Sequence, residues 1–158
     1  MNKVLVVILA GLLLTAFLLY GFYAFFMYSV KAMHRKQTVA ENVQITSDWL
    51  EITPENPLEA TKQVQKIMLS IEGYEHDIEK NDFGNIKLAD GTNINPEVQI
   101  VDENGKIYQL LDGMRLGNDV GFTPNQDFQK KMTFKSVRIR SNKSFRCQKI
   151  YWYDYDLK

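Results

Sequence analysis

Side chains that do nucleophilic or acid–base chemistry are few in this sequence. It has two histidines, His34 and His76, and one cysteine, Cys147. Catalysis of this kind needs a base beside its nucleophile, and no nucleophile motif accompanies His76, which stands in an acidic stretch. We therefore predict no catalytic residue, a solvated loop at His76 and a packed, apolar environment for Cys147. The alternative is a small hydrolase that uses carboxylate or His76 chemistry.

Clusters of side-chain oxygens are the second chemical feature. Asp90, Asn93 and Asp102 belong to oxygen-rich segments with Asp-Gly or Asn-Gly pairs, and hard cations such as calcium prefer clustered oxygen ligands. None of these segments matches the EF-hand loop, and Asp, Asn and Gly are also the residues that β-turns require. We predict turns here and no bound cofactor, with calcium at Asp90, Asn93 and Asp102 as the alternative. Two histidines and one cysteine, widely spaced, disfavour a zinc site.

Three tyrosines alternate along the C-terminal segment. Tyr151, Tyr153 and Tyr155 share one face of an extended strand, and Ile150 and Trp152 share the other. One face must be buried, so Ile150 and Trp152 are predicted to lie in the core. The tyrosines then form either a cross-strand ladder or a surface that stacks on sugar rings or binds a protein partner.

Basic residues concentrate just before this strand, because residues 128–150 hold eight of them and no acidic residue. Arg138 and Arg140 alternate there with Val137 and Ile139, which predicts that the arginines point away from the core. The simplest interpretation is that they neutralise acidic neighbours, and the alternative is a basic patch facing an anionic partner. Together with the tyrosines, Arg138 and Arg140 are the candidate ligand-binding residues.

The segments that must position these residues have the sequence pattern of a β protein. Short apolar runs alternate with turn residues at spacings typical of a sandwich or jelly roll. Strands are predicted at residues 48–53, 97–102, 106–111, 134–140 and 146–157. Glu103-Asn104-Gly105 joins the second to the third as a hairpin, because Asn and Gly tolerate positive φ. Residues 57–62 resemble a short helical turn before a strand at 63–73, and residues 31–47 show no clear period and are interpreted as a linker.

The last two predicted strands resemble a known group of folds. They are similar to the final strands of galactose-binding-like jelly rolls, a group that includes discoidin-type and many carbohydrate-binding domains. The resemblance is carried by Ser136–Ser141, Phe145 and Ile150–Tyr153. An early strand of the same group is matched by Lys66–Ile71. The resemblance covers about 100 residues and implies a β-sandwich. It assigns no ligand residue, because the loops of that group vary.

The N-terminal segment differs from all of this. Residues 4–30 contain no charged residue, and a helix of that length reaches about 40 Å, more than the roughly 30 Å hydrocarbon core of a bilayer. A signal peptide has a shorter apolar core and a small-residue cleavage site, so the segment is predicted to be an uncleaved anchor in the lipid bilayer. Lys31, Arg35 and Lys36 after it favour a cytoplasmic C-terminal domain by the positive-inside rule, whereas Lys3 and the compact β-domain favour export, and we expect the outside.

These patterns predict three regions: a transmembrane helix at 1–30, a linker at 31–47 and one jelly-roll-like β-sandwich at 48–158. All 19 acidic residues lie after residue 40, so the folded part is slightly acidic, which disfavours nucleic acid as a partner. The expected function is a membrane-anchored binding or structural module with a protein or carbohydrate partner, and the alternative is a membrane-bound hydrolase.

Overall fold

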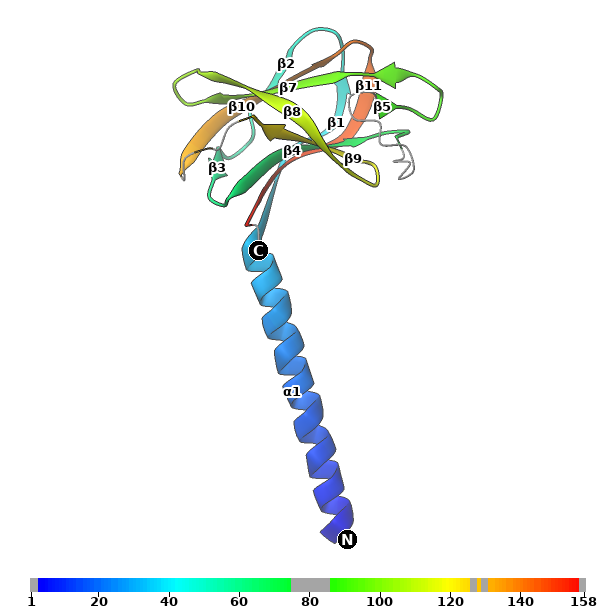
Figure 1. Cartoon of the computed structure of the whole chain (residues 1–158), viewed down its shortest axis with the longest axis vertical. Helices are drawn as coiled ribbons and strands as arrows, with labels where there is room; N and C mark the ends of the chain where they lie inside the picture. Colours follow the sequence, from blue (N-terminus) through cyan, green and yellow to red (C-terminus); the bar gives the residue numbers. More distant parts are fainter. Residues whose placement is uncertain (1–2, 75–85, 126–127, 129–130, 157–158) are drawn as a thin grey trace. The chain divides into compact units, whose positions relative to one another are not determined.

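The computed structural model describes residues 3–74, 86–125, 128 and 131–156. The chain divides into two compact units, Met1–His34 and Arg35–Lys158. The first holds one helix and the second holds antiparallel β-strands (Figure 1). The predicted class, a mainly β protein preceded by one N-terminal helix, is therefore confirmed.

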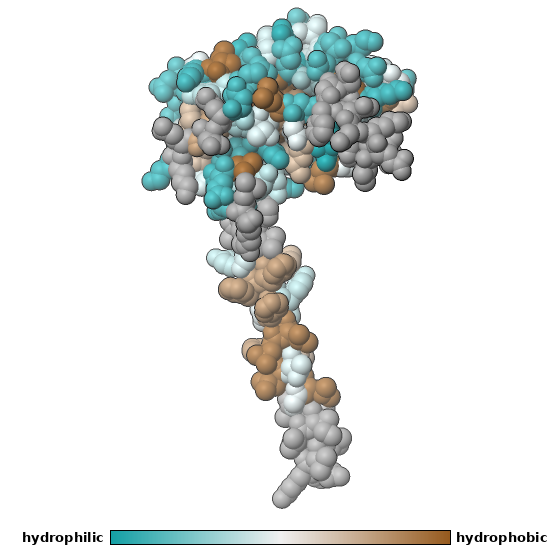
Figure 2. All heavy atoms as spheres, in the orientation of Figure 1, coloured by the Kyte–Doolittle hydropathy of each residue, from teal (hydrophilic) through white to brown (hydrophobic). Residues whose placement is uncertain are grey.

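Helix α1 runs from Lys3 to Met33. Its stretch Gly11–Ser29 is long and apolar enough to cross a membrane, by length and composition. Large apolar side chains of this stretch are exposed, for example Phe17 and Phe22 at 75% and 72%. The described part of the helix is mostly brown and tan in Figure 2, whereas the surface of the strand unit is largely teal and white.

The first strand corrects the linker interpretation of residues 31–47. Strand β1 spans His34–Ile45 and directly follows α1. It pairs with β11 at one edge of the large sheet, and its side chains Val39 and Ile45 are buried in the core. The sequence pattern hid this strand because an edge strand is half solvated, and most residues between these two apolar positions are polar or small.

The remaining strands of the large sheet follow in chain order. They are β2 Leu50–Ile52, β3 Leu58–Ala60, β4 Val64–Ile71, β7 Pro96–Asp102, β8 Ile107–Leu116, β9 Asp119–Pro124, β10 Met132–Ser141 and β11 Phe145–Tyr155. Their order is β1-β11-β4-β9-β8-β7-β10-β2, with β3 paired to β10, and β5 Ile86–Lys87 and β6 Asn93–Ile94 form a separate pair. The predicted strands at 48–53, 63–73, 97–102, 106–111, 134–140 and 146–157 are thus confirmed, with shifted ends.

Strand β8 joins the two layers of the sandwich. Its first residues pair with β7 and its later residues pair with β9, with a register shift between Asp112 and Met114. A bulge of this kind bends and twists a strand. One layer therefore contains β1, β11, β4 and β9, and the other contains β7, β10 and β2, as Figure 1 shows for β4 and β9 against β7 and β10.

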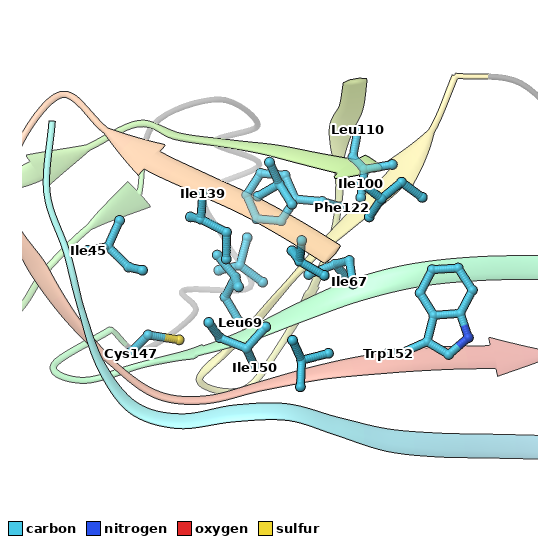
Figure 3. Packing of buried hydrophobic residues seen from close by; sticks show 14 of the residues in the cluster. Ile45, Ile67, Leu69, Ile100, Leu110, Phe122, Ile139, Cys147, Ile150 and Trp152 are labelled. Carbon is cyan, nitrogen blue, oxygen red and sulfur yellow. The ribbon is translucent and has the colours of Figure 1, made fainter. Parts of the chain in front are cut away.

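The core lies between these layers. Trp152 of β11 and Phe134 of β10 are fully buried, and their ring centroids are 5.7 Å apart. Figure 3 shows Ile150 and Trp152 pointing toward the same interior as Ile139 and Phe122. The prediction that Ile150 and Trp152 are core residues is confirmed, since neither is exposed.

Two local predictions need correction. The hairpin between β7 and β8 forms, but only Gly105 has a positive φ, 84°, and the turn extends from Asp102 to Lys106. Residues 57–62 contain β3 rather than a helical turn, because Leu58 and Ala60 are both fully buried with Glu59 exposed between them. Burial of alternate side chains against β10 overrides the local capping signal.

Candidate ligand-binding face

The three tyrosines of β11 lie on the side of their layer that faces away from the core. Tyr151 is 7% exposed, and Tyr153 and Tyr155 are half-buried. The rings of Tyr153 and Tyr155 are stacked, with centroids 5.0 Å apart and planes at 30°. We call this outer surface of β1, β11, β4 and β9 the tyrosine face; it carries Tyr151, Tyr153, Tyr155, Lys36, Lys66 and Asp119.

Strand register sets the neighbours of the tyrosines. Tyr153 stands opposite Lys66 of β4, and Tyr151 stands opposite Met68, which in turn stands opposite Gly121 of β9. A Cβ atom on Gly121 would come within 2.8 Å of the Met68 sulfur. A larger residue at this position would require the Met68 side chain to move, so glycine leaves room for Met68 on the face.

Two lysines contact the tyrosine rings. The Lys36 Nζ atom lies 5.1 Å from the Tyr151 ring centroid and 5.2 Å from that of Tyr153. The Lys66 Nζ atom lies 5.4 Å from the Tyr155 ring centroid. A cation at this distance from an aromatic ring is attracted by the ring quadrupole. The tyrosine face thus combines aromatic rings with positive charge.

Asp119 belongs to β9, the strand of the tyrosine face that lies farthest from β1. The Tyr151 hydroxyl donates a hydrogen bond of 2.5 Å to Asp119 Oδ2, and the Ser70 hydroxyl donates to Oδ1. Burial and this hydrogen bond raise the pKa of Tyr151 well above its ordinary value. Tyr151 therefore keeps its proton at neutral pH and remains a donor to Asp119.

A cavity of about 320 Å³ opens beside this hydrogen-bonded group. Its lining residues come from four strands: Lys36 and Thr38, Ser70, Asp119, and Lys149 and Tyr151. Lys149 forms an ion pair of 3.1 Å with Glu41 of β1. The cavity is polar and holds both charges, so it is equipped to bind a hydroxylated or charged ligand.

The two candidate arginines lie elsewhere. Arg138 and Arg140 belong to β10, in the layer opposite β11. Both guanidinium groups lie over the Trp49 ring, at 5.0 and 4.6 Å from its centroid. The structure therefore does not bring Arg138 and Arg140 together with the three tyrosines.

Acidic neighbours pair with the same arginines. Arg140 Nη2 lies 2.8 Å from Glu97 Oε2, and Arg138 Nε lies 3.8 Å from Glu51 Oε2. Arg146 pairs with Glu72 at 3.5 Å in the same way. These contacts support the interpretation that the basic strands neutralise acidic ones.

The calcium candidates belong to two different hairpins. Asp90 accepts a hydrogen bond from the Thr92 backbone in the turn between β5 and β6, where Asn93 begins β6. Asp102 accepts hydrogen bonds from the Asn104 and Lys106 backbone N–H groups and from the Tyr108 hydroxyl. Desolvation opposes ionisation of Asp102, but these bonds outweigh it and lower its pKa. Among residues 3–74, 86–125, 128 and 131–156, no three His, Cys, Asp or Glu side chains form a metal-binding group.

His76 falls outside the described residues, so the solvated loop expected there and the hydrolase alternative that uses His76 both stay predictions. Cys147 is fully buried, and the carbonyl oxygens of Ser70 and Lys149, at 3.4 and 3.3 Å from Sγ, are both within reach of its single S–H donor. Burial raises its pKa to about 12, so the thiol is not a nucleophile at neutral pH.

Sequence patterns missed Lys36, Lys66 and Asp119 as members of the face. The signal for Lys66 was present, because Lys66, Met68 and Ser70 alternate with apolar residues along one strand. Lys36 lies in the segment interpreted as a linker, and Asp119 lies on β9, for which no strand was predicted. Only the strand order brings these residues beside the tyrosines.

Comparisons with known proteins add little to this description. No protein-family model matches the chain, and no curated protein matches it in sequence. Among solved structures, the fold is similar to a mutant of a family 29 carbohydrate-binding module complexed with cellulohexaose. That match has 6% identity and a TM-score of 0.34, and covers 78% of this chain and 94% of the other. At that TM-score, the fold class rests on the strand order of the chain itself.

Proposed function

We propose that this chain is a membrane-anchored β-sandwich that binds a carbohydrate on the tyrosine face. The proposal depends most on the stacked and half-buried pair Tyr153 and Tyr155, which lies on the same strand as Tyr151, a residue that lines the polar cavity. The C–H face of a sugar ring packs on an aromatic ring, while hydroxyl groups need nearby donors and acceptors. The tyrosine face offers both kinds of contact.

Anchoring is supported by the composition of α1. Its described side chains are apolar and exposed over Gly11–Tyr28. Exposing this much apolar surface to water is strongly unfavourable, whereas a helix satisfies its own backbone hydrogen bonds in lipid. The proposal therefore places α1 in the bilayer and the strand unit in water.

The hydrogen bonding and protonation of the polar groups on the tyrosine face favour binding over catalysis. Asp119 accepts hydrogen bonds from Tyr151 and Ser70, and the raised pKa of Tyr151 keeps its hydroxyl protonated. These groups are suited to hold a ligand in position. A hydrolase would instead require a base near an activated nucleophile.

Saturation-transfer NMR tests the proposal directly. The full-length chain, in nanodiscs, is mixed with neutral and acidic oligosaccharides, and transfer of saturation to sugar protons is recorded. We expect transfer with the wild-type chain and its loss in the double variant Tyr153→Ala/Tyr155→Ala. The matched control is Trp49→Ala, which removes an aromatic ring from the opposite layer and should leave the transfer unchanged. Loss of transfer in the control, with retention in the double variant, would refute the proposal.

A further inference from the structure

Most basic side chains of the strands have an acidic partner. Ion pairs join Arg35 to Glu59 at 3.2 Å and Lys149 to Glu41 at 3.1 Å, and Arg138, Arg140 and Arg146 are paired as described above. Among the described strand residues, Lys36, Lys66, Lys87 and Lys135 have no such partner, and of these four Lys36 and Lys66 lie on the tyrosine face. Within the described part of the chain, neither has a carboxylate within 4.0 Å of its Nζ atom.

The surroundings of Lys66 make this unusual. The residue is only 9% exposed, and its Nζ atom contacts the Met114 sulfur at 3.1 Å and the Tyr155 ring. An ammonium group has three donors, and a thioether sulfur and an aromatic ring are weak acceptors. Neither contact neutralises the charge, so an anion that reaches the Nζ atom would gain a charge-assisted hydrogen bond.

Lys36 supplies the second charge. Its ammonium group lies over the Tyr151 and Tyr153 rings and lines the 320 Å³ cavity. Lys36 and Lys66 thus stand on either side of the stacked Tyr153–Tyr155 pair, one on β1 and the other on β4. Among the described residues, Asp119 is the one carboxylate that lines the cavity, and its oxygens already accept hydrogen bonds from Tyr151 and Ser70.

We propose that the ligand of the tyrosine face is an acidic glycan, in which sugar rings carry carboxylate or phosphate groups. This inference rests on the proposed function and specifies its ligand. A sugar ring packs on Tyr153 and Tyr155, and the acidic substituents accept hydrogen bonds from Lys36 and Lys66. Asp119 repels an anion, so the acidic groups lie toward Lys66 and the neutral hydroxyls lie toward Asp119 and Ser70.

The test compares each acidic probe with its neutral equivalent. Affinities of the full-length chain, in nanodiscs of uncharged phosphatidylcholine, are measured by calorimetry for oligogalacturonate and for its methyl ester. Phosphorylated and unmodified maltotriose form a second pair, which separates carboxylate from phosphate as the recognised group. We expect at least one acidic probe to bind about tenfold more tightly than its neutral equivalent. Added salt should reduce that difference, because it screens exposed charges.

Substitutions of single lysines then test which side chains recognise the acidic group. Lys36→Gln and Lys66→Gln should each reduce the acidic preference, which is the ratio of the affinity for the acidic probe to the affinity for its neutral equivalent, several-fold. Lys135→Gln is the matched control, since it removes the same charge from an exposed position on β10, in the other layer, and it should change neither affinity. A variant's circular-dichroism spectrum and melting temperature show whether it remains folded.

The outcomes separate this inference from the proposed function. Equal affinity for acidic and neutral probes, abolished by Tyr153→Ala/Tyr155→Ala, would overturn the acidic ligand and keep the carbohydrate-binding face. An acidic preference that survives Lys36→Gln and Lys66→Gln but is lost in Lys135→Gln would also overturn it. Binding of none of the four probes would overturn both.

Discussion

Trp152 and Tyr153 are adjacent in the chain and have opposite environments. Trp152 is fully buried against Phe134, and its indole N–H donates to the Glu59 carbonyl at 3.1 Å. Tyr153 is half-buried on the outer face. Trp152→Ala should therefore lower the free energy of unfolding by about 3–5 kcal/mol, and Tyr153→Ala by about 1 kcal/mol. Chemical denaturation of the two variants measures both values, and equal losses would mean that the face assignment is wrong.

Cys147 provides a second residue-level prediction. Burial raises its pKa to about 12 in the folded chain, whereas an unfolded cysteine has a pKa near 8.5. The reactive thiolate is therefore nearly absent from the folded protein at pH 8, and appears only above about pH 11 or on unfolding. Alkylation by iodoacetamide at pH 8 should be negligible in buffer and complete in concentrated guanidinium chloride. The chain has a single cysteine, so rapid labelling of the folded protein would contradict the burial directly.

At the level of the elements, β1 matters most for stability and for the site. It covers the edge of β11, buries Val39 and brings Lys36 over the tyrosine rings. A chain starting at Arg35 should be soluble and show a β-type circular-dichroism spectrum. A chain starting at Gln44 should lose about 3 kcal/mol of stability or more, from Val39 burial and lost strand pairing, and should aggregate through the exposed edge of β11. Equal melting temperatures for the two chains would show that β1 is dispensable.

The elements also show which features the sequence could predict. Strands β7, β8, β10 and β11 were predictable because each alternates clearly and is bounded by turn residues. Strand β1 was not, since its partner β11 lies about a hundred residues later and its polar residues mask the period. The tyrosine stripe was recognised from local alternation, whereas Lys36, Lys66 and Asp119 join it only through the strand order. Arg138 and Arg140 lie in the other layer from the tyrosines, which the sequence could not show because alternation assigns a side chain to a face of its strand but not to a layer.

At the level of the whole molecule, we expect the strand unit to lie outside the cytoplasm. Arg35 pairs with Glu59 and Lys36 packs on the tyrosines, so both basic residues have a role in the folded unit that accounts for their presence near the helix. Protease added to intact cells should remove an epitope tag from the C-terminus. A cytoplasmic protein of the same cells serves as the lysis control, and protection of the tag until lysis would reverse the orientation.

Binding on the tyrosine face is the central claim, and tyrosine-selective labelling tests it most directly. The full-length chain is produced with ¹³C-labelled tyrosine rings and titrated with oligogalacturonate, and the ring signals are assigned by Tyr→Phe substitution. Tyr153 and Tyr155 should shift with increasing ligand, while Tyr108, buried among Phe128 and Phe134, should stay constant. Bound ligand with no shift at Tyr153 or Tyr155 would contradict the account.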